Sequence, residues 1–552
     1  MEALIVDELT KILPTQRPCS GELSRTRLSN ELFQFQIAWN ESPQGITRIT
    51  APITISAGEG ATVQCEEAML VPVSTPYFTG DDDGYLISAP ALVSDVLRPL
   101  SMNKHSDEDE VTTWLCLAPQ RHQGWNSVWV TVLNPGEQIN VTVAGIALPA
   151  IKVTTIPATI PEPDIVNTRW FHCDSLAHVA GVPVWSEDHW QVIENQMIAA
   201  RRMHVNCLLM PLWTPPLDTA PGQRRMPTQL LDITREGDGR YSFDTSRAVR
   251  WLNLVKKHGF SAIEIPHIFT QWGAQACAQF YIRDGHDVHP TFGWETPATA
   301  PEYRTFLEQL IPFVRHFLGE HMEPSSLYFH ISDEPAEDNV DTYVAARAQV
   351  LDLLDGCQVI DALSDVAYHE LVDTAVVATD AIDKFRANNI EPEWVYYCVC
   401  QETRLANQFI AQRPNRHRHI GFQLYKAGTR GFLQWGYNFY NMQLSTGYVD
   451  PFWENDAGGG FISGDPFIVY PGPEGQVWES IRHRMVGAGF QDLAVCQYAE
   501  KLIGRDAVLD IIDPDHDVDY AHGWVPEREL IRRRERLNLA IKTHLQEQAK
   551  EL

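Results

Sequence analysis

Hydrophobic and polar positions alternate over short runs in the first part of the chain, from about residue 25 to 150. The run at 32–39 places four large apolar side chains on one face of an extended strand: Phe33, Phe35, Ile37 and Trp39. Similar runs recur between turn-forming Gly, Pro, Asn and Asp residues, at 68–73, 113–117, 127–133 and 140–148. This pattern is typical of a β-sandwich, which we expect over residues 1–155.

The pattern changes after a Pro- and Thr-rich linker at 156–163. Short apolar runs now read as strands that are buried on both faces: 169–173, 205–210, 262–266, 327–331, 358–362, 374–378, 394–400 and 431–435. Apolar residues at helical spacing predict helices between most of them, for example over 190–203, 246–257 and 303–318. Eight such units match a (β/α)8 TIM barrel, which is typically about 250 residues long.

The whole chain is therefore predicted to have a mixed β and α/β fold. The N-terminal β-sandwich is followed by the (β/α)8 barrel, which we expect over residues 165–505. A short C-terminal helical extension, at 506–552, includes a charged helix over 527–552.

Composition narrows the choice of partners and compartment. The 43 basic and 72 acidic residues give a net charge of -29, which argues against binding to nucleic acid or to an anionic membrane surface. No apolar run approaches the roughly 20 residues of a membrane span. The start carries Glu2, Asp7 and Glu8 where a signal peptide would be basic and then apolar, and the ten cysteines lack disulfide-framework spacing. We therefore expect a cytoplasmic protein, whose oligomeric state the sequence does not predict.

The strongest chemical signal lies in the stretch 326–336, where a buried strand ends in two acids. Asp333 and Glu334 follow the apolar run directly, and Pro335 prevents further strand pairing. In (β/α)8 barrels the carboxyl ends of the strands carry the active site. A solvated turn, or an N-cap for a helix near Asp341, would explain an isolated acid pair equally well. The position after the fourth predicted strand favours a catalytic pair.

Two neighbouring carboxyl groups suit glycoside hydrolysis, which needs an acid and a group that stabilises the positive centre. Apolar surroundings and the charge of Asp333 could raise the pKa of Glu334, so that Glu334 acts as the acid. Asp333 could then orient and polarise a 2-acetamido oxygen that attacks from the substrate itself. Alternatively, Glu402, just after the seventh predicted strand, is an enzymic nucleophile. We favour a place for Glu402 in the first turn of the following helix.

Other residues at the strand ends are candidates for sugar contacts. They are Asp174 after the first strand, Trp213 after the second, His267 and Trp272 after the third, Asp361 near the end of the fifth, Tyr396 and Tyr397 in the seventh, and Trp435, Tyr437 and Asn438 at the eighth. Each aromatic residue could equally belong to the barrel core. Trp435 and Tyr437 are the stronger candidates, because their strand has ended and a long Gly- and aromatic-rich segment, 441–475, follows as a lid or rim.

No metal site or cofactor is predicted. The spacing of His286 and His289 is too common to indicate a metal.

Several motifs of the chain resemble one known family when they are taken together. They are Phe329-His-Ile-Ser-Asp-Glu-Pro335, Gly428-Thr-Arg-Gly-Phe-Leu-Gln-Trp435, Asp465-Pro-Phe-Ile-Val-Tyr-Pro-Gly472, Ser480-Ile-Arg482 and Glu31-Leu-Phe-Gln-Phe-Gln36. This combination resembles glycoside hydrolase family 123, over most of the chain from residue 25 to 500. The resemblance implies a retaining β-N-acetylgalactosaminidase-like enzyme whose catalytic Asp-Glu pair is Asp333 and Glu334.

The sequence thus predicts a hydrolase that removes terminal β-linked sugars, N-acetyl-β-D-galactosamine first among them, by a retaining substrate-assisted mechanism. One alternative is a β-galactosidase-like hydrolase that uses two carboxylates, Glu334 and Glu402. Another is a non-catalytic carbohydrate-binding protein built on a hydrolase fold. In every case the expected partner is a carbohydrate, either an oligosaccharide or a glycoconjugate.

Overall fold

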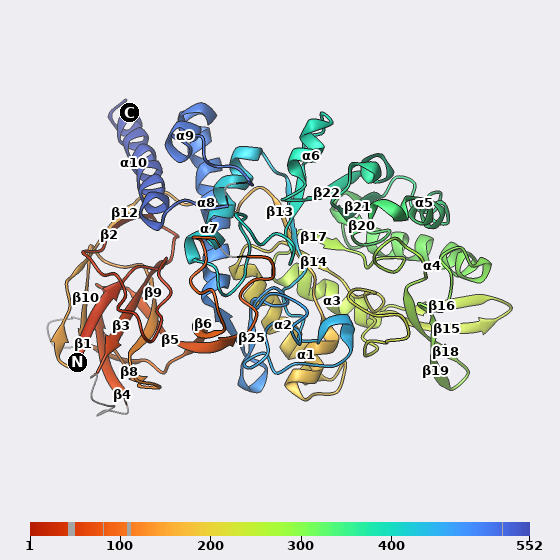
Figure 1. Cartoon of the computed structure of the whole chain (residues 1–552), viewed down its shortest axis with the longest axis horizontal. Coiled ribbons are helices and arrows are strands. Elements are labelled where there is room, and N and C mark those ends of the chain that lie inside the picture. The colour runs from red at the N-terminus through yellow and green to blue at the C-terminus, as the bar shows by residue number, and fades with distance from the viewer. Residues whose placement is uncertain (42–49, 81, 107–111, 522, 552) are drawn as a thin grey trace. The chain divides into compact units, whose positions relative to one another are not determined.

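The computed structural model describes residues 1–41, 50–80, 82–106, 112–521 and 523–551, and Figure 1 shows the order of the elements. Contacts divide the chain into two compact units. The first comprises Met1–Asp164, Glu402–Ala427 and Trp478–Leu552, and the second comprises Ile165–Gln401 and Gly428–Val477. The linear division that we expected is therefore not the one that the contacts define. The segment Glu402–Ala427, and the segment Trp478–Leu552 with the expected C-terminal extension, belong to the first unit, and their helices pack on one another.

A β-sandwich forms most of the first unit, as predicted. One sheet runs in the order β1 (Glu2–Val6), β3 (Phe33–Asn40), β9 (Trp125–Leu133), β5 (Thr62–Val73), β6 (Ala91–Pro99) and β26 (Val477–Ser480). The other runs in the order β2 (Ser24–Leu28), β12 (Ile151–Ile156), β10 (Gln138–Val143), β4 (Thr50–Ser56), β8 (Thr112–Pro119) and β7 (Asn103–Ser106), with β11 (Ile146–Ala147) beside β10. The apolar face predicted for β3 is buried in the core together with Ile53 and Ile55 of β4. The two-residue periodicity therefore predicted the buried face of β3 correctly.

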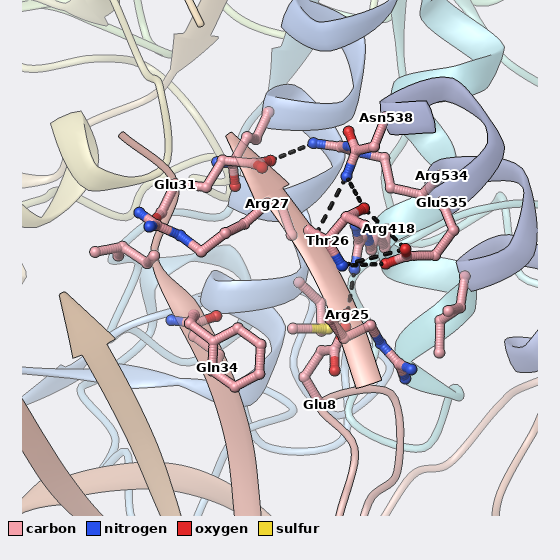
Figure 2. Close-up of a pocket in the computed structure, with 16 residues that line it drawn as sticks. Glu8, Arg25, Thr26, Arg27, Glu31, Gln34, Arg418, Arg534, Glu535 and Asn538 are labelled. Atoms are coloured by element: carbon pink, nitrogen blue, oxygen red, sulfur yellow. Dashed lines mark hydrogen bonds and ion pairs between the residues drawn. The ribbon is translucent and has the colours of Figure 1, made fainter. Parts of the chain in front are cut away.

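The helices of the first unit are α7 (Pro414–Ala427), α8 (Ile481–Ile503), α9 (Arg505–Ile512) and α10 (Glu527–Glu551). Polar contacts fasten α10 to β2, as Figure 2 shows around a small cavity, and a further ion pair fastens α10 to α8. Arg534 lies between Glu31, with which it forms an ion pair, and Asp492, whose Oδ1 is 2.9 Å from the Arg534 Nε. Glu535 accepts hydrogen bonds from the backbone N–H and the hydroxyl of Thr26, at 3.0 and 2.8 Å. The charged C-terminal helix is thus bound through its polar residues.

Arg534→Ala should destabilise the first unit by about 3 kcal/mol, because it leaves the carboxylates of Glu31 and Asp492 buried without this partner. Arg418 still pairs with Asp492, at 2.7 Å, which keeps the loss at the lower end of the range for buried pairs. Arg532→Ala is the matched control, since that side chain is 60% exposed and pairs only with Glu529 among the described residues. Urea unfolding of both variants measures the difference, and equal midpoints would contradict this assignment.

Eight parallel strands form a closed barrel in the second unit, which confirms the predicted fold class. They are β13 (Val166–Arg169), β14 (Cys207–Leu209), β17 (Ala262–Glu264), β20 (Leu327–Phe329), β21 (Gln358–Leu363), β22 (Thr374–Ala378), β23 (Trp394–Tyr396) and β24 (Gly431–Gln434). Parallel pairing of β13 with β24 closes the barrel. The first strand was predicted at 169–173, which is three residues too late at its start and four at its end. Phe171 is apolar because it is buried beyond the strand end, and Cys173 already begins a helix.

The helices of the second unit are α1 (Cys173–Ala180), α2 (Glu187–Arg202), α3 (Ser246–Lys257), α4 (Pro301–Gly319), α5 (Val340–Ala348) and α6 (Ile382–Ala387). Short 3-10 turns, η1 to η5, lie at Pro324–Ser326, Glu337–Asn339, Val366–Leu371, Gln443–Ser445 and Pro473–Gly475, and β25 is Tyr470–Pro471. A four-stranded sheet was not predicted. It consists of β16 (Arg240–Asp244), β15 (Asp232–Gly237), β18 (Gln279–Asp284) and β19 (Asp287–Phe292), beside α4 (Figure 1). Within the described residues, no helix has the length and apolar character needed to cross a bilayer.

Candidate active site

The acid pair lies just beyond β20, at the carboxyl end of the barrel strands. Three residues separate the end of the strand from Asp333 and Glu334. Glu334 has a φ of 40°, in the left-handed region, which costs about 1–3 kcal/mol for a residue other than glycine. The carbonyl of Asp333 accepts a hydrogen bond from the backbone N–H of Trp272 at 2.8 Å. The loop after β17 therefore helps to hold the acids in place.

A cavity at these strand ends contains the acid pair. Five residues singled out from the sequence line it: Asp333, Glu334, Trp272, Tyr396 and Trp435. Lining residues that the sequence analysis missed include Trp170, Asp218, Gln271, Cys398 and Phe461. Trp272 is 43% exposed, which is unusual for so large an apolar side chain and gives the cavity an accessible aromatic face. Adjacent carboxyl groups beside exposed aromatic surface are the features that a sugar-cleaving site requires.

The surroundings of Glu334 favour its protonated form. Burial raises the pKa of the Glu334 carboxyl, and the charge of Asp380 raises it further. The Tyr396 hydroxyl donates a hydrogen bond to Glu334 Oε1 at 2.6 Å, and the Cys398 thiol lies 3.5 Å from the same oxygen. These two contacts lower the pKa but do not cancel the effect of burial. Glu334 thus keeps its proton to a higher pH than an ordinary glutamate, as a general acid should.

Asp333 has an even less favourable environment for charge. Burial and then the charge of Glu334 hold the pKa of the Asp333 carboxyl well above its usual range. The charges of Asp361 and Asp218 act in the same direction, whereas His330 lowers the pKa. The charge on either carboxyl group therefore favours the protonated form of its neighbour.

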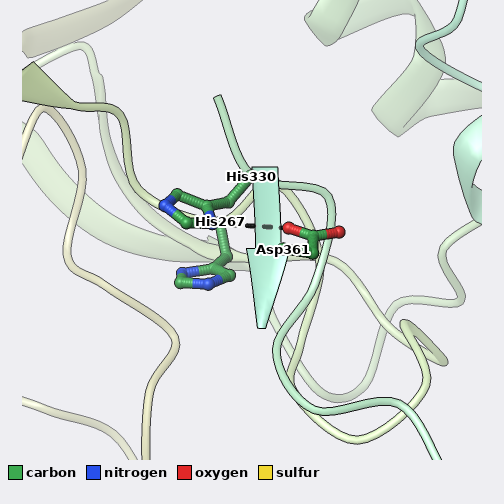
Figure 3. A group of neighbouring side chains, drawn as sticks. All are labelled: His267, His330 and Asp361. Carbon is green, nitrogen blue, oxygen red and sulfur yellow. Dashed lines mark ion pairs between the residues drawn. The ribbon is translucent and has the colours of Figure 1, made fainter. Parts of the chain in front are cut away.

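His330 is a buried cation next to this pair. Its Nε2 is 2.8 Å from Glu264 Oε2 and its Nδ1 is 3.4 Å from Asp361 Oδ1. Burial lowers the pKa of His330, but hydrogen bonds and ion pairs with both carboxylates outweigh it and raise the pKa to about 9. The ring of His267 stacks on that of His330 with centroids 4.3 Å apart. Figure 3 shows these two side chains together with Asp361. Burial and the charge of His330 lower the pKa of His267, which is therefore neutral.

His267, His330 and Asp361 each offer a possible ligand atom within 4.8 Å of one another, which raises the question of a metal. A metal would require His330 to be deprotonated, whereas its two carboxylate neighbours favour the imidazolium form. The oxygens of Asp361 also accept the backbone N–H groups of Ile331 and Ser332, at 3.0 and 3.3 Å. We interpret the group as an ionic network that fixes the backbone immediately before Asp333.

Seven predicted sugar contacts are not among the residues that line this cavity: Asp174, Trp213, His267, Asp361, Tyr397, Tyr437 and Asn438. All seven are buried and contact other parts of the protein. Asp174, for example, forms an ion pair with Arg225 at 2.6 Å, and the Tyr437 hydroxyl donates to the carbonyl of Gln196 at 2.7 Å. Successive side chains at a strand end point to opposite sides. Tyr396 therefore reaches Glu334, whereas Tyr397 packs on Phe432.

The sequence analysis missed these lining residues for identifiable reasons. Trp170 and Cys398 were assigned to strand interiors because the first and seventh strands were predicted too far toward the C-terminus, whereas β13 ends at Arg169 and β23 ends at Tyr396. Asp218 lies in the long segment between β14 and β15, which has no hydrophobic period. Its position after the second barrel strand was the one signal that could have indicated it.

Glu402 is not in the first turn of a helix, so that prediction is wrong. The next helix, α7, begins at Pro414. The buried carboxylate of Glu402 accepts the backbone N–H groups of Phe78 and Thr79, at 2.8 and 2.9 Å, and the Thr79 hydroxyl. These bonds engage both carboxylate oxygens and hold two segments of the first unit together, which favours a structural role for Glu402.

Glu402→Gln should therefore lower stability and leave catalysis nearly unchanged. The amide presents a donor to one of the N–H groups that the carboxylate accepts, and an unsatisfied buried group costs about 1–3 kcal/mol. The unfolding midpoint should fall, while kcat of the folded variant stays within a few-fold of the unaltered enzyme. Loss of kcat, together with a covalent sugar adduct on Glu402 in mass spectra, would instead identify this residue as a nucleophile.

A closed (β/α)8 barrel with an acid pair at the carboxyl ends of its strands is an arrangement found in barrel-type glycoside hydrolases. The family model "Glycoside hydrolase 123, catalytic domain" matches residues 170–499 of this chain. The match covers more than half of the chain, which therefore belongs to glycoside hydrolase family 123. The resemblance drawn from the sequence motifs is thus confirmed, and the protein is a glycoside hydrolase with a carbohydrate substrate.

One solved structure agrees with this assignment at the level of the fold. The chain is similar to a family 123 glycoside hydrolase from Clostridium perfringens whose structure was described in relation to glycolipid glycan hydrolysis, with a TM-score of 0.69. The two share 14% identity, and the match covers 100% of this chain and 99% of that one. A weaker likeness, with a TM-score of 0.32 and 8% identity, is to xylanase 10B from Clostridium thermocellum, over 82% of this chain and 90% of that chain. A comparison with curated proteins gave no match.

Proposed function

We propose that the protein removes terminal β-linked 2-acetamido-2-deoxy sugars, N-acetyl-β-D-galactosamine first among them, with retention of configuration. The observation that carries this proposal is the presence of the adjacent acids Asp333 and Glu334 in one cavity. Retaining enzymes that use two carboxylates place them about 5–5.5 Å apart, on either side of the scissile bond. Neighbouring residues at one strand end suit a different division of labour, in which the acetamido group of the substrate attacks the anomeric carbon.

Glu334 is the general acid of the proposed first step. It protonates the leaving oxygen while the acetamido oxygen forms a bond to the anomeric carbon. In the second step the resulting Glu334 carboxylate removes a proton from the water that opens the oxazolinium ring. The raised pKa of Glu334 supports the first role, and its contact with the Tyr396 hydroxyl stabilises the carboxylate needed for the second.

Asp333 accepts the acetamido N–H and stabilises the positive charge that develops on the nitrogen. This role needs the ionised carboxylate, although burial raises the pKa of Asp333 in the free protein. An N–H donor from the substrate favours the charged form, as does the imidazolium of His330. Substrate binding therefore places the shared proton of the pair on Glu334 and the negative charge on Asp333.

The stereochemistry of the product tests this proposal. Proton NMR of the first sugar released from an aryl N-acetyl-β-D-galactosaminide should show the β-anomer before mutarotation. A thiazoline analogue of the oxazoline should inhibit competitively, because it resembles the ring that the acetamido group forms. Initial release of the α-anomer would overturn the proposal. Sugar binding without cleavage of any aryl β-glycoside would indicate the non-catalytic alternative.

A further inference from the structure

Asp218 contributes a third carboxyl group to the cavity, in addition to the acid pair. Its Oδ2 accepts the backbone N–H of Leu444 at 2.8 Å, and its carbonyl accepts the hydroxyl of Ser445 at 2.7 Å. Asp218 itself is held by Gln271, whose side-chain oxygen accepts the Asp218 N–H. Both Leu444 and Ser445 have a positive φ, at 57° and 53°, so this turn of the segment after β24 needs such support.

The other carboxylate oxygen, Oδ1, accepts no hydrogen bond from any N–H or O–H group of the described residues, although the side chain lines the cavity. Burial raises the pKa of Asp218 to about 6, against the lowering effects of the Leu444 N–H and Arg225, so that the group is ionised at neutral pH. A partly desolvated carboxylate oxygen is strongly favoured to accept a hydrogen bond. Apart from the acetamido N–H that is assigned to Asp333, the donors that a sugar offers are its hydroxyl groups.

We propose that Asp218 is a specificity-determining residue, whose Oδ1 accepts a hydrogen bond from one hydroxyl group of the terminal sugar while its Oδ2 holds the turn at Leu444. The inference rests on the proposed function only in placing a sugar in this cavity. Since a site built to accept a hydroxyl rejects a sugar that lacks it, Asp218 selects substrates by the position of that hydroxyl. The same side chain connects sugar recognition with the order of the segment 441–475.

Asp218→Asn separates the two roles of this side chain. The oxygen of the introduced amide can still accept the Leu444 N–H, while the NH2 group replaces the acceptor that faces the cavity. Ser445→Ala is the matched control, because it removes the hydroxyl bond to the Asp218 carbonyl and leaves the carboxylate intact. The substrates are the aryl glycoside that the unaltered enzyme cleaves best and its 3-deoxy, 4-deoxy and 6-deoxy derivatives.

The unaltered enzyme should lose about 10- to 100-fold in kcat/KM on one of the three deoxy substrates. In Asp218→Asn, kcat/KM should fall by a similar factor on the parent glycoside. This variant should cleave that deoxy substrate as efficiently as it cleaves the parent. Ser445→Ala should lower kcat/KM by one common factor on all four. If no aryl glycoside is cleaved, which would refute the proposed function, calorimetric binding of the corresponding methyl glycosides gives the same comparison.

Three results would overturn the inference. If Asp218→Asn lowered kcat/KM by the same factor on all four substrates, relative to the unaltered enzyme, Asp218 would only support the turn at Leu444. Unchanged kinetics or binding would mean that it does not contact the sugar. Complete loss of turnover, with a covalent sugar adduct on Asp218 in the unaltered enzyme, would make it a nucleophile.

Discussion

Glu334→Gln should lower kcat by about 10²–10⁴-fold on glycosides with a poor leaving group, because proton donation to the departing oxygen is lost. The glutamine side chain has nearly the same shape and still accepts the Tyr396 hydroxyl, so the strained backbone at this position should persist. Dinitrophenyl glycosides need no protonation of the leaving group and should show a much smaller defect. The same fold-loss on both kinds of substrate would argue that the variant is misfolded or that Glu334 is not the acid.

The pH dependence of activity gives a second test of the role of Glu334. In the proposed mechanism the protonated form of Glu334 is the active one, and burial raises the pKa of this carboxyl group above that of an ordinary glutamate. Activity should therefore be retained below this raised pKa and fall as the pH increases through it. On glycosides with a poor leaving group, the unaltered enzyme should show this alkaline limb and Glu334→Gln should lack it.

Asp333→Asn should lower kcat by about 10²–10³-fold, since it removes the charge that stabilises the developing oxazolinium nitrogen. This loss should persist on dinitrophenyl glycosides, because ring formation is needed whatever the leaving group. The different effects of the leaving group on the two variants distinguish the roles of Glu334 and Asp333 more firmly than the loss of kcat in either variant alone. If dinitrophenyl glycosides rescued Asp333→Asn as well as Glu334→Gln, the proposed division of labour would be wrong.

The two kinetic constants should also differ in their response to acid. The pKa of Asp333 is raised well above its usual range in the free enzyme, whereas the acetamido N–H favours its ionised form in the complex. The profile of kcat/KM reports the free enzyme and that of kcat reports the complex. The acid limb of kcat should therefore lie at lower pH than the acid limb of kcat/KM.

The parts of the fold that the sequence predicted are those with a regular local pattern. The alternation in β3 and the apolar runs of β20 and β22 depend only on neighbouring residues and on which face is buried. The acid pair was found for a similar reason, since Pro335 marks the point at which pairing of the strand must stop. The four-stranded sheet at 232–292 was missed because much of it is exposed, so that few of its apolar residues reveal an alternation.

The rest of the site depends on contacts between residues that are far apart in the chain. Asp361 was predicted to bind sugar, but it accepts the N–H groups of Ile331 and Ser332 instead. Asp218 meets Leu444, more than two hundred residues later. Neither contact leaves a local signal, because a polar residue at a strand end looks the same whether it meets a ligand or a distant backbone group.

The central claim is that the acetamido group of the substrate is the nucleophile, and comparing two substrates tests it most directly. The measurement is kcat/KM for an aryl 2-acetamido-2-deoxy-β-D-galactoside and for the aryl β-D-galactoside with the same leaving group. Without the acetamido group the first step has no intramolecular nucleophile, so the plain galactoside should be cleaved at least about a thousandfold less efficiently. Comparable cleavage of both substrates, with a sugar covalently attached to an enzyme carboxylate, would contradict the account.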